Sequence, residues 1–171
     1  MKRNLRWSLA PAIALMFLAV LSQNVYSAGS LTDLEGDPVK FSDHVPADRW
    51  LVVMIWSWTC PICAQEMADY AQFHLRHKGG RLTLLGISLD GASDIMEAWA
   101  FAEEHGTTFP NLIGEGQELA HFFYEQTRQS LQGTPTFLIY APGGHLKAVQ
   151  AGAVPPEAIE AFIEQQEDAG E

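Results

Sequence analysis

Cysteine and cationic side chains are both scarce in this 171-residue sequence. Only two cysteines occur, Cys60 and Cys63, so a framework of several disulfide bonds is excluded. Lysine and arginine number 10 against 21 aspartates and glutamates, which gives a formal net charge of -11. A chain this acidic is repelled by phosphate backbones, which argues against nucleic-acid binding. Apolar residues make up 47% of the chain, so wholesale disorder is excluded as well.

No apolar run at the N-terminus reaches the roughly 20 residues that a transmembrane helix requires. The run over residues 9–21 (LAPAIALMFLAVL) has 13 residues and follows three cations with no acid, namely Lys2, Arg3 and Arg6. A charged start, a short apolar run and small residues after it are typical of a signal peptide. We expect residues 1–28 to be removed by cleavage near Ser27 or Ala28, and the alternative is an uncleaved N-terminal anchor. In either case the rest of the chain is exported, and we expect a periplasmic protein.

Residues 29–171 contain no repeat, low-complexity tract or linker, and we expect one domain that ends in a short acidic tail. Turn signals and apolar periodicity predict the following elements: a hairpin over 31–42, a strand over 51–56, a helix from Pro61 to the Gly79-Gly80 stop, a strand over 82–89, a helix over 93–105 capped by Ser93, a helix over 117–125, strands over 136–140 and 145–151, and a helix that opens at Pro155-Pro156. This order predicts an α/β fold with an N-terminal β-hairpin and a central mixed sheet that is covered by helices on both faces.

The chemistry of the chain is concentrated where the first buried strand meets a helix, in the segment Cys60-Pro61-Ile62-Cys63. A cysteine at a helix N-terminus lies beside unpaired backbone N–H groups and the positive end of the helix dipole, both of which stabilise a thiolate. Cys60 is therefore the candidate nucleophile. Cys63, one turn later, is placed to attack the mixed disulfide and resolve it. Proline at position 61 suits a first helical turn.

Other roles for the cysteine pair are less favoured. A zinc site requires four ligands, and the six histidines are scattered without a paired pattern beside a cysteine. A purely structural disulfide across so short a loop would stabilise the fold only weakly. A non-enzymatic copper protein could hold Cu(I) with two thiolates, but no methionine or histidine is adjacent to either cysteine. We expect neither a metal nor another cofactor, and the metal content of the purified protein tests the copper alternative.

The same segments resemble a known family. The hairpin over 31–42 followed by LVVMIWSWTCPIC resembles the opening of TlpA/ResA-like thioredoxin-fold proteins, which are exported thiol–disulfide oxidoreductases. The resemblance continues through residues 85–88, Phe109-Pro110 and residues 133–139. It implies a thioredoxin fold, protein thiols and disulfides as clients, and a membrane electron donor of the DsbD type. Peroxide-reducing proteins of this fold need a proline upstream of the cysteine, and residues 56–59 contain none.

The resemblance also implies roles for residues outside the cysteine pair. Pro135 is expected to be a cis-proline opposite the cysteines, which leaves the backbone of Thr134 free to pair with a client peptide. Asp90 is a candidate for moving protons at the buried cysteine, and the alternative is an ordinary turn or helix-cap residue. Trp58 is displaced by one position from the tryptophan that commonly precedes the first cysteine, where this chain has Thr59. Its side chain either shields the thiol or fills a surface groove.

The direction of electron flow is the remaining question at this level. Neither Pro61 nor Ile62 brings a cationic or hydrogen-bonding side chain to the Cys60 thiolate, and Glu66 follows one turn into the helix. A poorly stabilised thiolate favours a reducing couple. We therefore expect a reductase of protein disulfides, and the alternative is a DsbA-like oxidase.

Overall fold

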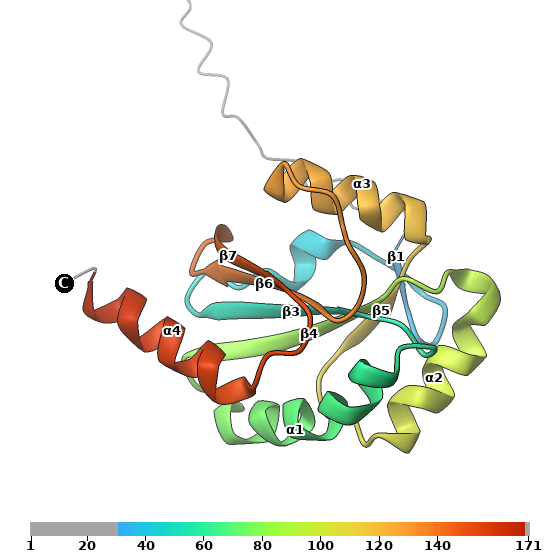
Figure 1. Ribbon diagram of the computed structural model, residues 1–171, viewed down its shortest axis with the longest axis horizontal. Helices are drawn as coiled ribbons and strands as arrows, with labels where there is room; N and C mark the ends of the chain where they lie inside the picture. Colours follow the sequence, from blue (N-terminus) through green and yellow to red (C-terminus); the bar gives the residue numbers. More distant parts are fainter. Residues whose placement is uncertain (1–30, 170–171) are drawn as a thin grey trace, which may run out of the picture.

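A seven-stranded mixed sheet forms the centre of the structure (Figure 1). The computed structural model describes residues 31–169, so the expected signal peptide and its cleavage position lie outside the described residues, as do the last two residues of the tail. The strand order is β2-β1-β5-β4-β3-β6-β7. The central strand β3 (Trp50–Trp56) pairs parallel with β4 (Leu82–Ser88) and antiparallel with β6 (Thr136–Ala141). The mixed sheet that the sequence predicts is thus confirmed.

The remaining elements follow the chain between and around these strands. They are β1 (Leu31–Asp33), β2 (Pro38–Val39), the 3-10 helix η1 (Phe41–His44), α1 (Pro61–His77), the 3-10 helix η2 (Ala92–Asp94), α2 (Ile95–Glu104), β5 (Asn111–Ile113), α3 (Gly116–Thr127), β7 (His145–Ala151) and α4 (Pro156–Asp168). Within residues 31–169, none of these helices is both long enough and apolar enough to cross a membrane.

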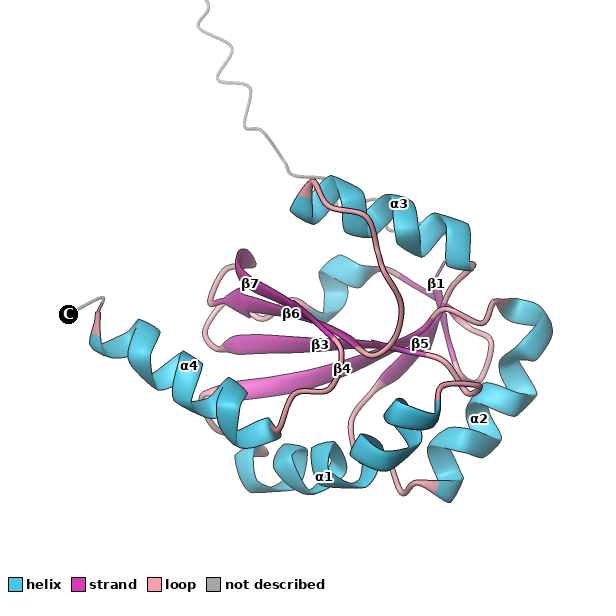
Figure 2. Cartoon of the chain, in the orientation of Figure 1, coloured by secondary structure: helices cyan, strands magenta, loops and turns pink. Residues whose placement is uncertain are grey.

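Helices cover both faces of the sheet, as the strand–helix order predicts. Helices α1, α2 and α4 lie on one face, and α3 lies on the other with η1 (Figures 1 and 2). Side chains of β3 alternate between the two cores: Val52 and Met54 pack on the first side, whereas Val53 and Ile55 pack on the second. Every residue of β3 is buried, which explains why its sequence is a continuous apolar run rather than an alternating one.

The sequence missed one strand. β5 pairs parallel with β4 and antiparallel with β1, and so joins the N-terminal hairpin to the rest of the sheet. Its three residues are all buried. A strand this short, which begins with asparagine directly after Pro110, is too brief to show a period in its sequence.

The predicted cap at Ser93 is wrong. Ser93 lies inside η2, and α2 begins at Ile95 with no side-chain cap bond. Gly91, with φ of +81°, turns the chain there, and the backbone N–H of Ala92 donates to the Glu115 carboxylate at 3.1 Å. The segment is therefore held as a tight 3-10 turn by contacts that come from a distant loop, and the α-helix starts only after that turn.

Candidate active site

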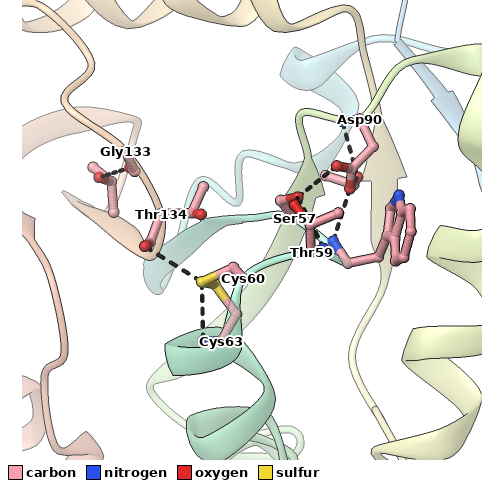
Figure 3. The surroundings of a disulfide bond; sticks show 10 residues. Ser57, Thr59, Cys60, Cys63, Asp90, Gly133 and Thr134 are labelled. Carbon is pink, nitrogen blue, oxygen red and sulfur yellow. Dashed lines mark hydrogen bonds between the residues drawn. A yellow bond between two sulfur atoms is a disulfide. The ribbon is translucent and has the colours of Figure 1, made fainter.

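The cysteine pair lies at the N-terminus of α1, at the carboxyl end of β3 (Figure 3). Cys60 is the N-cap residue and Pro61 is the first residue of the helix, as the sequence predicts. A disulfide bond joins Cys60 to Cys63. The backbone N–H of Cys63 donates to Cys60 Sγ at 3.1 Å, which is the bond that an N-cap side chain makes to the third residue of its helix.

The two sulfurs differ in their access to solvent. Cys60 is 8% exposed and Cys63 is fully buried. Cys60 borders a groove of about 420 Å³, whereas Cys63 does not line it. The groove is bordered mainly by the loop before α1 and by the loop before β6, and its lining residues are Ser57, Thr59, Cys60, Pro61, Ile62, Leu89, Gly133 and Thr134. A molecule that enters this groove therefore meets Cys60 first.

The loop before β6 places a backbone acceptor beside the nucleophile. The Thr134–Pro135 peptide bond is cis, and the carbonyl oxygen of Thr134 lies 3.3 Å from Cys60 Sγ (Figure 3). The loop is held on both sides, because Thr136 Oγ1 donates to the carbonyl of Gly133 at 2.7 Å and the N–H of Gly152 donates to the carbonyl of Pro135 at 2.8 Å. The structure thus brings Thr134 and Pro135 next to the cysteine pair.

Asp90 follows β4 and reaches across to the loop before Cys60. Its carboxylate accepts hydrogen bonds from the hydroxyl of Ser57, the backbone N–H of Trp58 and the hydroxyl of Ser88 (Figure 3). The resemblance implies that Asp90 moves protons at the buried cysteine, Cys63. None of these three hydrogen bonds joins Asp90 to Cys63. The Trp58 side chain stays 39% exposed.

The carboxylate of Glu66 is partly buried and hydrogen-bonded, which its position in the sequence does not indicate. It lies one turn after Cys63 on α1, and its carboxylate accepts the backbone N–H of Val154 at 2.9 Å. The second carboxylate oxygen is buried and has no hydrogen-bond partner. Burial raises the pKa of Glu66, and the neighbouring charge of Asp69 adds to the effect. The sequence feature that indicates this residue is its position three residues after Cys63, because side chains at that spacing lie on the same face of a helix.

The buried amide of Asn111 holds the side chain of Trp56, the residue directly before the loop that leads to Cys60. Asn111 Oδ1 accepts the indole N–H of Trp56 at 3.0 Å, and Asn111 Nδ2 donates to the carbonyl of Phe109 at 3.0 Å. Trp56 is fully buried, stacks on Phe101 and directly precedes the loop that carries Asp90's partners. Within the described part of the chain, no group of three or more His, Cys, Asp or Glu side chains is arranged to hold a metal ion.

Comparisons with known proteins agree with this geometry. Residues 25–149 match the model of the AhpC/TSA family. No curated protein sequence matches the chain. Solved structures that share its fold include the following three. A secreted Mycobacterium tuberculosis disulfide oxidoreductase homologous to E. coli DsbE has a TM-score of 0.63 at 16% identity, over 83% of this chain and 98% of that one. A thiol:disulfide interchange protein of the thioredoxin family from Chlorobium tepidum has a TM-score of 0.66 at 18% identity, over 80% and 91%. A thioredoxin-related protein from Neisseria meningitidis has a TM-score of 0.67 at 17% identity, over 81% and 98%.

These similarities confirm the predicted thioredoxin fold, while the narrower TlpA/ResA-like assignment stays a prediction. The family match covers most of the sheet together with the cysteine pair. The pair itself lies at a helix N-terminus beside an open groove, which is the arrangement that thiol–disulfide exchange requires. The chain therefore belongs to the AhpC/TSA family, and with its Cys60–Cys63 pair it is a thioredoxin-like thiol–disulfide oxidoreductase.

Proposed function

We propose that this protein is a periplasmic reductase of protein disulfides, with Cys60 as the nucleophile and Cys63 as the resolving thiol. The difference in exposure between the two sulfurs supports this assignment, because only Cys60 borders the groove. The groove also offers the Thr134 backbone as a partner for an extended client segment.

The reaction proceeds through two exchanges. The Cys60 thiolate attacks one sulfur of the client disulfide, and the other client sulfur leaves as a thiolate that takes up a proton. The Cys63 thiolate then attacks Cys60 Sγ and releases the second client sulfur, which is protonated in turn. The client disulfide gains two electrons, and the protein dithiol loses two as it becomes the Cys60–Cys63 disulfide. A membrane donor of the DsbD type would return those electrons.

The surroundings of Cys60 Sγ support the reducing direction. The sulfur has one backbone N–H donor, from Cys63, and faces the carbonyl oxygen of Thr134 at 3.3 Å. A carbonyl oxygen accepts a hydrogen bond from a thiol but repels a thiolate, so it favours the protonated form of Cys60. Among the described residues, no cationic side chain donates to either sulfur. A weakly stabilised thiolate makes the dithiol a better electron donor.

The proposed location rests on the N-terminal sequence. Three cations, a 13-residue apolar run and small residues form the pattern of a signal peptide over residues 1–28. The M. tuberculosis neighbour is described as secreted, which is a property of that protein and agrees with this proposal. N-terminal sequencing of the protein purified from the periplasm tests both the export and the cleavage near Ser27 or Ala28.

The reduction potential tests the direction of electron flow. We expect the Cys60–Cys63 couple to lie near about -270 mV, as for thioredoxin, rather than near about -120 mV, as for DsbA. The purified protein is equilibrated in glutathione buffers, and the oxidised fraction is read by alkylation of free thiols. A potential at or above roughly -150 mV would contradict the reductase and support a DsbA-like oxidase.

Glu66 is the proposed acceptor of the Cys63 proton. The two side chains lie on one face of α1, three residues apart, and the Glu66 carboxyl has an elevated pKa and one buried oxygen without a partner. Glu66→Gln keeps an oxygen for the Val154 N–H but cannot take a proton. We expect it to slow release of the second client thiol by on the order of a hundredfold, with the first attack by Cys60 little changed. Rapid-quench separation of the mixed disulfide from the products measures the two steps. An unchanged second step would exclude this role.

The elevated pKa of Glu66 also predicts a pH dependence of stability. A carboxyl whose pKa is raised by folding favours the folded state at low pH, and this contribution is lost as the pH rises through the folded pKa. Wild type should therefore lose stability relative to Glu66→Gln as the pH rises above 4.5, the ordinary pKa of a glutamate carboxyl. Urea unfolding of both proteins across this range measures the difference. Parallel curves would show that the Glu66 pKa is not raised.

A further inference from the structure

The Asp90 carboxylate accepts hydrogen bonds from two polar groups of the segment that leads into Cys60 and from Ser88 at the end of β4. The Asp90 carboxylate accepts from Ser57 Oγ at 2.5 Å, from the Trp58 N–H at 2.9 Å and from Ser88 Oγ at 2.6 Å. Ser57 is 5% exposed and Ser88 is fully buried, so water does not readily replace these bonds. Figure 3 shows the carboxylate from the loop after β4 facing the loop after β3.

The direction of each bond follows from the chemistry of the carboxylate. An ionised carboxylate only accepts hydrogen bonds, so the Ser57 hydroxyl proton points to Asp90. Ser57 Oγ must then accept from Thr59, whose Oγ1 lies at 2.9 Å and whose backbone N lies at 3.2 Å. The carboxylate thus orients Ser57, and Ser57 in turn holds Thr59, the residue directly before the nucleophile.

The same segment forms the turn that opens α1. The backbone N–H of Cys60 donates to the carbonyl of Ser57 at 3.1 Å, and Cys60 then receives the Cys63 N–H on its sulfur. The hydrogen bond to Cys60 Sγ depends on where this turn places Cys60. This turn lies in the loop between β3 and α1, and two of its polar groups, Ser57 Oγ and the Trp58 N–H, donate to Asp90 just after the end of β4.

We infer that Asp90 is a positioning residue for the thiol–disulfide reaction: it holds the Ser57–Thr59 turn so that Cys60 Sγ meets the N–H of Cys63. This inference rests on the proposed role of Cys60 as the nucleophile. In this inference Asp90 acts on Cys60 through the turn and does not move protons at Cys63. The acceptor of the Cys63 proton is then Glu66, as proposed above.

Two substitutions at Asp90 separate position from charge. In Asp90→Asn, the amide oxygen can accept from Trp58 and Ser88 while the amide NH₂ donates to Ser57, whose hydroxyl then turns to Thr59. The turn keeps its partners, and only the charge is lost. In Asp90→Ala, both the charge and all three bonds are lost. Any difference between these variants therefore reports positioning.

The readout is the pH profile of Cys60 alkylation in the reduced full-length protein, with the modified sulfur assigned by mass spectrometry. We expect Asp90→Asn to lower the midpoint by about half a unit, because a negative charge near the thiolate is removed. Asp90→Ala should have a midpoint above that of Asp90→Asn, because the loosened turn weakens the N–H bond to Cys60 Sγ. Ser57→Ala keeps the charge and cuts the link to Thr59, and it should raise the midpoint above wild type. It serves as the test if Asp90→Ala does not fold.

Asp94→Asn is the matched control, because it removes an equal charge four residues later. The Asp94 carboxylate accepts a hydrogen bond from Ser93 and not from the Ser57–Thr59 turn. It should keep the wild-type midpoint. Equal midpoints for Asp90→Asn and Asp90→Ala, or a Ser57→Ala midpoint at or below wild type, would overturn the inference. The inference would also be overturned if the Asp90 variants had lower thermal stability but the wild-type pH profile of Cys60 alkylation. Alkylation requires no client, so failure of the reductase proposal would leave this comparison intact.

Discussion

Cys63→Ser is expected to accumulate a stable mixed disulfide between Cys60 and a client, whereas Cys60→Ser accumulates none and loses activity to the uncatalysed rate. The expectation follows from access. Cys60 lines the groove, and Cys63 is fully buried behind it. A client disulfide can therefore reach the first sulfur, while the second is reached only from within the protein.

The lifetime of the mixed disulfide depends on Cys63. Intramolecular attack by a well-placed group corresponds to effective molarities of about 10⁵ M or more, so resolution in the wild type is fast. Serine at position 63 cannot form a disulfide, and the intermediate then waits for an external thiol. Because the Cys63 N–H belongs to the backbone, the substitution also leaves the hydrogen bond to Cys60 Sγ in place.

Non-reducing electrophoresis after incubation with a protein disulfide, followed by peptide mass spectrometry, measures this difference. The double variant, which has no cysteine, is the control for adducts formed without a thiol. Trapping by Cys60→Ser with none by Cys63→Ser would reverse the assignment of nucleophile and resolving thiol. Thermal unfolding of each variant shows that the protein is folded during the assay.

Gly86→Ala is expected to be among the most destabilising single changes in this protein, at about 3–5 kcal/mol. A Cβ on Gly86 would lie 2.9 Å from the indole nitrogen of Trp56 and closer still to the amide oxygen of Asn111. These are the two atoms of a buried hydrogen bond. The methyl group would therefore both overpack the core and leave a buried donor and acceptor without their partners.

The position of Gly86 in the sheet explains the effect. It lies in β4, between β3 and β5, and is paired with Asn111 on one side and Met54 on the other. The Trp56 side chain from β3 and the Asn111 side chain from β5 meet across this middle strand. Only a residue without a side chain leaves room for an indole and an amide there. Since Trp56 directly precedes Ser57, the effect should extend to the loop before Cys60.

A double-mutant cycle with Asn111→Ala measures the coupling. Without the amide, the closest clash is relieved and only the Trp56 contact remains, so Gly86→Ala should cost clearly less in that background. Urea unfolding of the four proteins gives the free energies. Additive effects, or a loss below about 1 kcal/mol for Gly86→Ala in the wild type, would show that the strand shifts to accommodate the methyl group.

Local features of the chain were predictable where one residue type or period carries the signal. The continuous apolar run of β3, the proline after Cys60 and the helical spacing of Met67 and Tyr70 each identify their element without knowledge of the fold. Pro135 and Thr134 were expected beside the cysteine pair from a resemblance, and the structure brings them there. For the strand and the helix, the determining interactions lie within a few residues of one another, whereas Thr134 is 74 residues from Cys60 and was expected there only from the resemblance.

The groups that support the cysteine pair were not predictable in the same way. Asp90 lies 33 residues from Ser57, and Asn111 lies 55 residues from Trp56. Neither pair has a sequence spacing that indicates contact, because the contacts arise only when β3, β4 and β5 lie side by side. The late start of α2 has the same origin, since Glu115 from the loop after β5 holds the backbone of Ala92.

The amino-acid sequence by itself determined the α/β class, the central buried strand and the position of Cys60 at a helix start, since backbone preferences and apolar periods are local. Only the tertiary structure decided that Cys60 borders the groove while Cys63 is buried, that Asp90 holds the loop, and that Glu66 is half-buried with an elevated pKa. Burial and hydrogen-bond partners are properties of packed neighbours, and those neighbours are chosen by strand order rather than by distance along the chain.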